Sequence, residues 1–286
     1  MTKLRALLTN DDGVSREGLQ TLRDELIARD FAATVIAPAE NQSGRARAVS
    51  CFGPIELERL HDDPENPIYS CAGTPVDCVR VAVLSDLLDP FDVVVSGINH
   101  GVNLGDDATF SGTLGAALEG ALLGIPSIAF SQQDDAGDWS LISHGHHHFR
   151  LAGFAAEMAR LRFDADLPAD VAVNVNFPHE LAEPAVEVSC FGHLAYPAGW
   201  TPAEPKGDGK WDVWPYAHPE RPDPEVILAE GTDVAGLAGG RVTMTAVSTD
   251  WSRAEVDAHR EAVEQLGSRS QVVLGDSLAA GGSVSG

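Results

Sequence analysis

The chain has 286 residues, 44% of them hydrophobic and 22% charged, which suffices for one large α/β domain or two small ones. Its formal net charge of -24 at pH 7 repels polyanions and argues against nucleic acid as a partner. The start shows no secretory signal pattern, and the apolar run at 116–130 is too short to span a bilayer. We therefore expect a cytoplasmic enzyme with no membrane partner. The four cysteines lack zinc-type spacing and predict no disulfide framework.

The first predicted strand, Leu4 to Thr9, runs directly into Asn10, Asp11, Asp12 and Gly13. Ligands of open parallel sheets bind at the carboxyl ends of the strands, so we expect the two aspartates at that edge. Adjacent carboxylates repel each other unless a cation lies between them, and hard oxygen donors select Mg²⁺, Mn²⁺ or Ca²⁺. The alternative is a plain turn, in which the glycine supplies a positive φ and the acids are solvated.

The remaining predicted elements are strands and helices, as expected for an open α/β sheet. Ser15 and Thr74 are expected helix N-caps, and Gly231-Thr232-Asp233 is expected to open a short helix. We expect helices at 16–28, from Thr74 onward, at 114–123, 149–161 and 251–266, strands at 33–37, 92–96, 125–131, 171–177 and 242–247, and extended pieces at 54–57 and 68–71.

Two polar loops leave the expected ligand edge. In the loop at 38–47, Ser43 offers a hydroxyl oxygen to a cation, and Arg45 and Arg47 offer positive charge to an anion, although a solvated connection is the alternative. The loop at 96–113 is longer and rich in glycine, and a loop of this kind inside a compact domain is more often functional than idle.

The second loop carries two further candidate groups. Asn99 can offer an amide oxygen to the same cation as the aspartates. Ser111, Gly112 and Thr113 stand directly before a helix, where free N–H groups and the helix dipole favour a phosphate.

Three later segments carry weaker signals. The histidine cluster His144 to His148 invites a transition-metal interpretation, but a solvated helix start explains it better. The stretch from Gly192 to Arg221 has no helical or strand period and predicts an arm outside the core. The Gly/Ser/Ala tail from Gly275 to Gly286 predicts disorder.

Five motifs in order resemble the SurE survival-protein family of nucleotidases, with weaker similarity in Asn174-Val175-Asn176 and Gly231-Thr232-Asp233. The motifs are Asn10-Asp11-Asp12-Gly13, Ala37-Pro38 through Asn41-Gln42-Ser43-Gly44, Gly73 through Val79, Ser96-Gly97-Ile98-Asn99 with Asn103-Leu104-Gly105, and Ser111-Gly112-Thr113 with Glu119-Gly120.

The resemblance implies a Rossmann-like, three-layer, mostly parallel sheet and a divalent-metal phosphatase. Its substrates would be nucleoside 5′- and 3′-monophosphates, and in some members short polyphosphate. One divalent cation per subunit, Mg²⁺ or Mn²⁺ with Ca²⁺ as a further candidate, would be bound by Asp11, Asp12, Ser43 and Asn99. Ser111, Gly112, Thr113 and Asn103 would line the phosphate site, with Asn10 beside it. The catalytic residues would come from Asp11, Asp12 and Asn10, and no general base can be assigned.

The resemblance also implies a catalytic domain at 1–190 and a subunit-exchanging arm with a C-terminal strand and helix at 191–273, before a disordered tail at 274–286. A homodimer or homotetramer follows from it. The sequence departs from the family pattern at Phe110, where a tyrosine is expected, and at Arg45-Ala46-Arg47, where small or polar residues are commoner.

Three other functions fit parts of the same sequence. A nucleotide-binding protein without catalysis would keep the same loops. An aspartyl-phosphate phosphatase would place Asn10 in the position of the nucleophile, and amides are poor nucleophiles. A Rossmann oxidoreductase would need a Gly-x-Gly-x-x-Gly turn after the first strand, which this sequence lacks.

Overall fold

A computed structural model describes residues 3–137, 139, 145, 147, 149–182, 186–195, 203–213 and 225–250. The chain divides into a compact unit, Met1–Thr249, and a second unit, Asp250–Gly286. The predicted helix at 251–266, the tail and His144, His146 and His148 lie outside the described residues. The division into a catalytic domain at 1–190 and an arm that begins at residue 191 stays a prediction.

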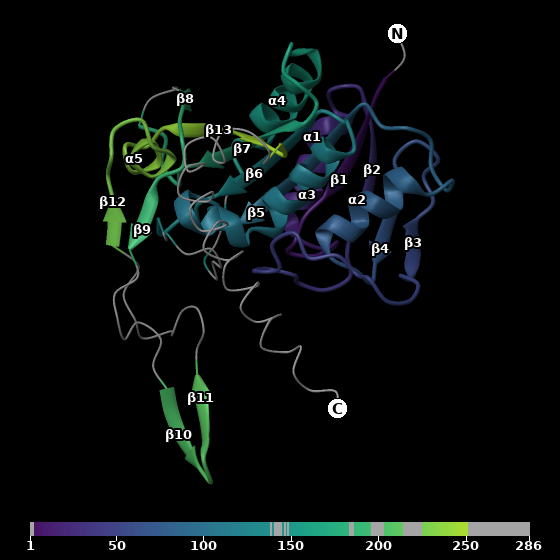
Figure 1. Cartoon of the computed structure of the whole chain (residues 1–286). Helices are drawn as coiled ribbons and strands as arrows, with labels where there is room; N and C mark the ends of the chain where they lie inside the picture. Colours follow the sequence, from purple (N-terminus) through teal and green to yellow (C-terminus); the bar gives the residue numbers. More distant parts are fainter. Residues whose placement is uncertain are drawn as a thin grey trace, which may run out of the picture. The chain divides into compact units, whose positions relative to one another are not determined.

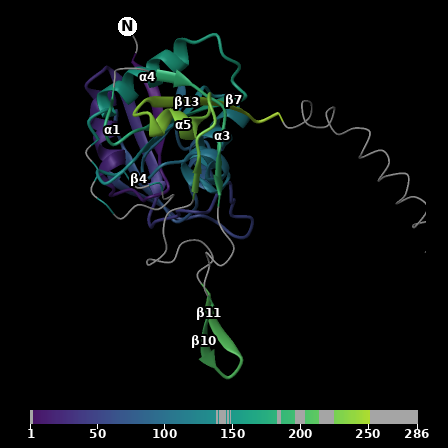
Figure 2. The ribbon, with the colours of Figure 1, turned by 90° about the vertical axis from the view of Figure 1, so that its left-hand side faces the viewer.

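A mixed, mostly parallel sheet forms the centre of the first unit (Figure 1, Figure 2). Its strand order is β3-β4-β2-β1-β5-β6-β7-β13-β8. Neighbours from β4 to β7 pair in parallel, β3 and β13 run antiparallel to β4 and β7, and β8 pairs in parallel with β13. The strands are β1 Leu4–Thr9, β2 Phe31–Pro38, β3 Leu57–His61, β4 Ile68–Cys71, β5 Val93–His100, β6 Ser127–Gln132, β7 Val171–Phe177, β8 Val186–Val188 and β13 Val242–Ser248.

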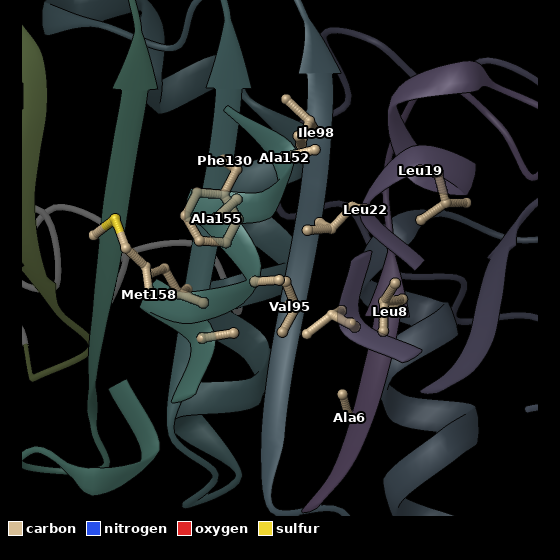
Figure 3. Packing of buried hydrophobic residues seen from close by; sticks show 14 of the residues in the cluster. Ala6, Leu8, Leu19, Leu22, Val95, Ile98, Phe130, Ala152, Ala155 and Met158 are labelled. Carbon is tan, nitrogen blue, oxygen red and sulfur yellow. The ribbon is translucent and has the colours of Figure 1, made fainter. Parts of the chain in front are cut away.

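Helices cover both faces of this sheet, and the fold is the expected α/β class. α1 (Glu17–Ile27) and α4 (Ala152–Asp164) pack on one face, where Leu19 and Leu22 of α1 belong to the same buried apolar cluster as Val95 and Phe130 of the sheet (Figure 3). α2 (Pro75–Leu84) and α3 (Gly112–Leu122) belong to two further apolar clusters with the sheet. A 3₁₀ helix, Gly105–Phe110, precedes α3, and α5 spans Asp233–Ala238. In the described part of the chain, no helix is both long and apolar enough to cross a membrane.

Two small antiparallel pairs lie in the segment predicted to be an arm. β10 (Ala203–Gly207) pairs with β11 (Lys210–Val213), and every residue of both strands is exposed. β12 (Glu225–Ile227) pairs with β9 (His193–Ala195). The use of this segment in subunit exchange stays a prediction.

Several local predictions differ from the structure. α1 has Arg16 rather than Ser15 as its N-cap residue, and no side chain caps it. The extended piece expected at 54–57 is instead the strand Leu57–His61. By contrast, Thr74 caps α2 as predicted, in a capping box with Asp77.

β5 continues to His100, beyond the predicted end at residue 96, so Asn99 lies in a strand. The pairing of β5 with β6 shifts in register between Ser96 and Asn99. Gly97 makes this possible, because its φ is +124° and a Cβ there would lie 2.3 Å from the carbonyl oxygen of Phe130. Such irregularities redirect side chains at the end of a strand.

The strand order reverses direction beside β1. The chain moves from β1 to β2 and β4 on one side, and then returns to the other side of β1 with β5, β6 and β7. Open α/β sheets bind ligands at this kind of reversal, outside the carboxyl ends of the strands. The residues that follow β1 and those that end β5 are therefore the first candidates for a site.

Candidate functional site

Asp11 and Asp12 follow β1 directly and are only 3% and 7% exposed. The turn that carries them is closed by Asn10. Its Nδ2 donates to the carbonyl oxygen of Gly13 (3.0 Å), and its Oδ1 accepts from the Gly13 N–H (3.2 Å). The amide of Asn10 thus holds the turn in place.

The N-terminus of α3 meets Asp11. The Thr113 hydroxyl donates to Asp11 Oδ1, and the backbone N–H groups of Gly112 and Thr113 also donate to this carboxylate. Burial raises the pKa of Asp11, and these hydrogen bonds oppose the effect of burial. Gly112 allows the close approach, because a Cβ there would lie 2.8 Å from Asp11 Cβ.

Asp12 accepts a hydrogen bond at Oδ2 from the backbone N–H of His100 (3.0 Å). Burial, and then the charge of Asp11, raise the pKa of Asp12 to about 7. Two buried, neighbouring carboxylates of this kind are costly to ionise together unless a cation neutralises them.

Asn99 and Ser43 are the neutral oxygen donors predicted for the cation. Asn99 is 3% exposed, and its Nδ2 donates to the carbonyl oxygen of Gly101 (2.9 Å). Within the described residues its Oδ1 accepts no hydrogen bond, so that oxygen is available to a ligand.

Ser43 lies in a loop that is fixed at two points beside the aspartates. The N–H of Gln42 donates to the carbonyl oxygen of Asp11 (2.7 Å), and the N–H of Ala46 donates to that of Phe110 (3.0 Å). Ser43 lies between these two points, and its own N–H donates to Asn41 Oδ1 (2.7 Å). The loop therefore spans from the end of β1 to the residue before the α3 cap.

The sequence predicts that Arg47 offers its charge to an anion, but in the structure the Arg47 side chain pairs with Glu119. Its Nη2 lies 3.0 Å from Glu119 Oε2, and Arg80 Nη1 lies 2.6 Å from Glu119 Oε1. The Glu119 side chain is 4% exposed. Arg45 is exposed, and its side chain forms no hydrogen bond to the described residues.

Ser111 and Asn103 have structural contacts in addition to their predicted role at the phosphate. Ser111 Oγ accepts from the N–H of Leu114 (2.9 Å) and caps α3. Asn103 Nδ2 donates to Ser131 Oγ (2.6 Å), and its carbonyl oxygen accepts from the side chains of Asn174 and Asn176. The hydrogen bonds of Asn103 thus run to β6 and β7 rather than to the aspartate pair.

No role at the site was predicted for Asp233, Glu119 or His100. Asp233 is fully buried and accepts hydrogen bonds from the N–H groups of Gly105 (3.0 Å) and Gly192 (2.8 Å). These bonds connect the loop at 96–113 to the segment at 186–195. The motif Gly231-Thr232-Asp233 was the only sequence signal for this contact.

His100 lies beside the site with a neutral ring. Its Nε2 accepts from the N–H of Gly18 (3.3 Å), and its ring centroid lies 4.8 Å from that of His147 and 5.0 Å from that of Phe149. Burial, then the charges of His147 and Arg16, lower the pKa of His100 to about 4. The ring is therefore uncharged at neutral pH.

The donor set at this edge suits a hard divalent cation. In the ranges that the structure describes, no three histidine, cysteine, aspartate or glutamate side chains gather to hold a metal. A cation here would use two carboxylates with neutral amide, hydroxyl or water oxygens, and Mg²⁺, Mn²⁺ and Ca²⁺ accept such sets. The available Oδ1 of Asn99 and the raised pKa of Asp12 fit that requirement.

Comparison with known proteins gives concordant matches. A family model described as "Survival protein SurE" matches residues 6–196. A protein named "5'-nucleotidase SurE" from Xanthomonas campestris pv. campestris (strain B100) is 36% identical over 258 residues, which are 87% of this chain and 92% of that protein. A protein of the same name from Stenotrophomonas maltophilia (strain R551-3) is 35% identical over 258 residues, with the same two coverages, 87% and 92%.

The solved structures include a similar fold. The crystal structure of the SurE protein from Aquifex aeolicus matches with a TM-score of 0.70 and 30% sequence identity. The match covers 91% of this chain and 99% of that one.

Proposed function

The chain belongs to the SurE family, and from that premise we propose that it is a divalent-metal-dependent 5′-nucleotidase. It hydrolyses nucleoside 5′-monophosphates to the nucleoside and inorganic phosphate. Nucleoside 3′-monophosphates and short polyphosphate carry the same terminal phosphoryl group and are further substrates in this proposal.

One observation carries the proposal. A buried carboxylate pair, Asp11 and Asp12, lies at the reversal of the strand order and touches the N-terminus of α3. In the proposal the two carboxylates bind the cation and the N-terminus of α3 binds the phosphate, and the hydrogen bond from the Thr113 hydroxyl to Asp11 joins the two. Phosphoryl transfer needs both, because its transition state carries charge on the phosphoryl oxygens and requires an oriented nucleophile.

In this proposal, Asp11, Asp12, Ser43 and Asn99 hold the cation. A bound divalent cation would polarise the phosphoryl oxygens and lower the pKa of a bound water molecule. The backbone at His100 keeps Asp12 oriented through its N–H, and the Gln42 N–H keeps the Ser43 loop against Asp11. Asn10 contributes by holding the turn that presents both aspartates.

The phosphate lies against Ser111, Gly112 and Thr113 in the proposal. The first N–H groups of α3 are the proposed donors, and the helix dipole stabilises negative charge there, whereas the Thr113 hydroxyl donates its one proton to Asp11. Asn103 secures this loop on β6 and β7, so that its neighbours keep their positions. In the proposal, Asp11 or Asn10 orients an attacking water molecule.

The test is phosphate release from AMP, 3′-AMP and tripolyphosphate, each with Mn²⁺, Mg²⁺ or EDTA. We expect release from AMP with metal and none with EDTA. Asp164→Asn serves as the matched control for Asp12→Asn, because Asp164 is exposed and lies at the end of α4. A chain that binds AMP with metal but never releases phosphate would instead be a nucleotide-binding protein.

We also propose that the chain acts as a homodimer or homotetramer. Exposed apolar side chains support this, among them Leu161 (64% exposed), Val188 (75%) and Trp211 (60%). Light scattering after size exclusion tests the proposal, and a monomer at micromolar concentration with full activity would contradict it.

A further inference from the structure

A cavity of about 410 Å³ opens beside Asp12. Its lining includes Asp12, Arg16, Glu17, Glu40, Asn41 and His100. Pockets for small ligands typically enclose 300 to 1,000 Å³, roughly the scale of this cavity. The residues assigned to the cation and the phosphate, apart from Asp12, do not line it.

The wall of this cavity that carries Glu40 is fixed to the end of β1. The N–H of Val14 donates to the carbonyl oxygen of Pro38 (2.9 Å), and the N–H of Gln42 donates to that of Asp11 (2.7 Å). Glu40 lies between these two anchors. Its backbone therefore keeps a set distance from the aspartate pair.

Two acidic side chains line the cavity with no hydrogen-bond partner among the described residues. Glu17 stands in the first turn of α1, where a carboxylate is stabilised by the helix N-terminus. Glu40 has no such explanation. Asp12 also lines the cavity and is 7% exposed, and among the described residues its carboxylate accepts a hydrogen bond at Oδ2 alone. The buried reaction centre thus opens into this space.

The chemistry of the lining selects a neutral group rich in hydroxyls. A carboxylate only accepts hydrogen bonds, and a vicinal diol offers two donors to its two oxygens. In dinucleotide-binding folds an acidic residue binds ribose hydroxyls in this manner. The lining carries the carboxylates of Asp12, Glu17 and Glu40 against one guanidinium, that of Arg16, so a second phosphate would meet more like charge than opposite charge.

We propose that this cavity is the subsite for the nucleoside, and that Glu40 accepts hydrogen bonds from the ribose hydroxyls and so favours ribonucleotides over 2′-deoxyribonucleotides. The assignment rests on the proposed phosphatase function and adds the substrate class to it. Glu40 is exposed, so the loss of a hydrogen bond to its charge corresponds to roughly a tenfold difference in affinity.

The experiment measures kcat/KM for AMP, 2′-deoxy-AMP and p-nitrophenyl phosphate with Mn²⁺. It compares the parent chain, Glu40→Ala and the matched control Glu58→Ala, whose glutamate is exposed on the edge strand β3. We expect the parent and the control to prefer AMP to 2′-deoxy-AMP by roughly tenfold. In Glu40→Ala this preference should fall to within about twofold, mainly through KM, with p-nitrophenyl phosphate turnover retained.

A second measurement does not depend on turnover. Calorimetric titration of adenosine and 2′-deoxyadenosine into EDTA-treated protein should give the same order of preference, and Glu40→Ala should lower adenosine affinity roughly tenfold.

Two outcomes would overturn different statements. A Glu40→Ala enzyme that keeps the parent's preference for AMP and its adenosine affinity overturns the ribose assignment and leaves the phosphatase proposal intact. If the parent releases phosphate from none of the three substrates, the proposed function fails, and the adenosine titration still decides whether Glu40 binds a nucleoside.

Discussion

Replacing Arg47 by alanine is expected to weaken cation binding, whereas replacing Arg80 by alanine is not. Both arginines pair with the buried carboxylate of Glu119, at 3.0 Å and 2.6 Å. Only Arg47 belongs to the loop that carries Ser43. Arg80 lies on α2 and serves as the matched control.

The magnitude follows from burial and from the shared partner. A hydrogen bond to a charged group contributes about 1.5–3 kcal/mol, and water replaces part of it because the Arg47 and Arg80 side chains are 28% and 42% exposed. We expect each single variant to lose about 1–2 kcal/mol of unfolding free energy. The double variant leaves the buried Glu119 carboxylate without a cationic partner. It should therefore lose about 3–5 kcal/mol of unfolding free energy, which exceeds the sum of two single losses of about 1 kcal/mol each.

Urea unfolding followed by circular dichroism gives the stabilities, and calorimetry gives the Mn²⁺ dissociation constant. We expect Arg47→Ala to raise that constant roughly five- to tenfold, about 1–1.4 kcal/mol, because the Ser43 loop loses its anchor on α3. Equal Mn²⁺ affinity in the two single variants would refute the reasoning, since only one of them releases the loop.

Three further predictions follow from the site and its support. Asp12→Asn should lower kcat on AMP roughly 10³-fold at saturating Mn²⁺, about 4 kcal/mol, and a rate near that of the parent would remove Asp12 from the cation site. Gly112→Ala should lower stability by about 1–3 kcal/mol in thermal unfolding, because its Cβ would lie 2.8 Å from Asp11 Cβ; an unchanged Tm would contradict this. For Asp77, burial raises the pKa, but hydrogen bonds from Ser50 and Thr74 outweigh burial and lower it overall from its ordinary 3.8. The ionised form therefore stabilises the fold above pH 3.8, and the deficit of Asp77→Asn in urea unfolding at pH 7 should shrink as pH falls below that value; a pH-independent deficit would contradict it.

Local signals predicted much of the framework. The bounds of β1 and β7 coincide with the predictions, because each strand is a short apolar run ended by polar residues or proline. Thr74 before Pro75 marked the start of α2, and Thr232 caps α5 through the N–H of Ala235 (3.3 Å). In each case the information lies within a few residues of the feature itself.

The features that the sequence did not predict depend on distant residues. Asn99 lies in a strand because β5 continues beside β6, and glycines at 97 and 101 had suggested a loop. Arg47 pairs with Glu119, 72 positions away, and no local pattern distinguishes that pair from a solvated charge. Asp233 contacts the N–H of Gly105 across 128 positions. The periodicity of side chains along the sequence does not indicate contacts between residues so far apart.

The contact between Asp11 and α3 links the proposed cation and phosphate sites. The N–H groups of Gly112 and Thr113, which we propose for phosphate, already donate to the Asp11 carboxylate. A phosphate and an uncompensated carboxylate compete for the same donors and repel each other. A cation held by both aspartates reduces that repulsion, so phosphate should bind better in its presence. By reciprocity, the cation should then bind better with phosphate present. The placement of Asp11 at a helix N-terminus thus makes the two ligands depend on each other.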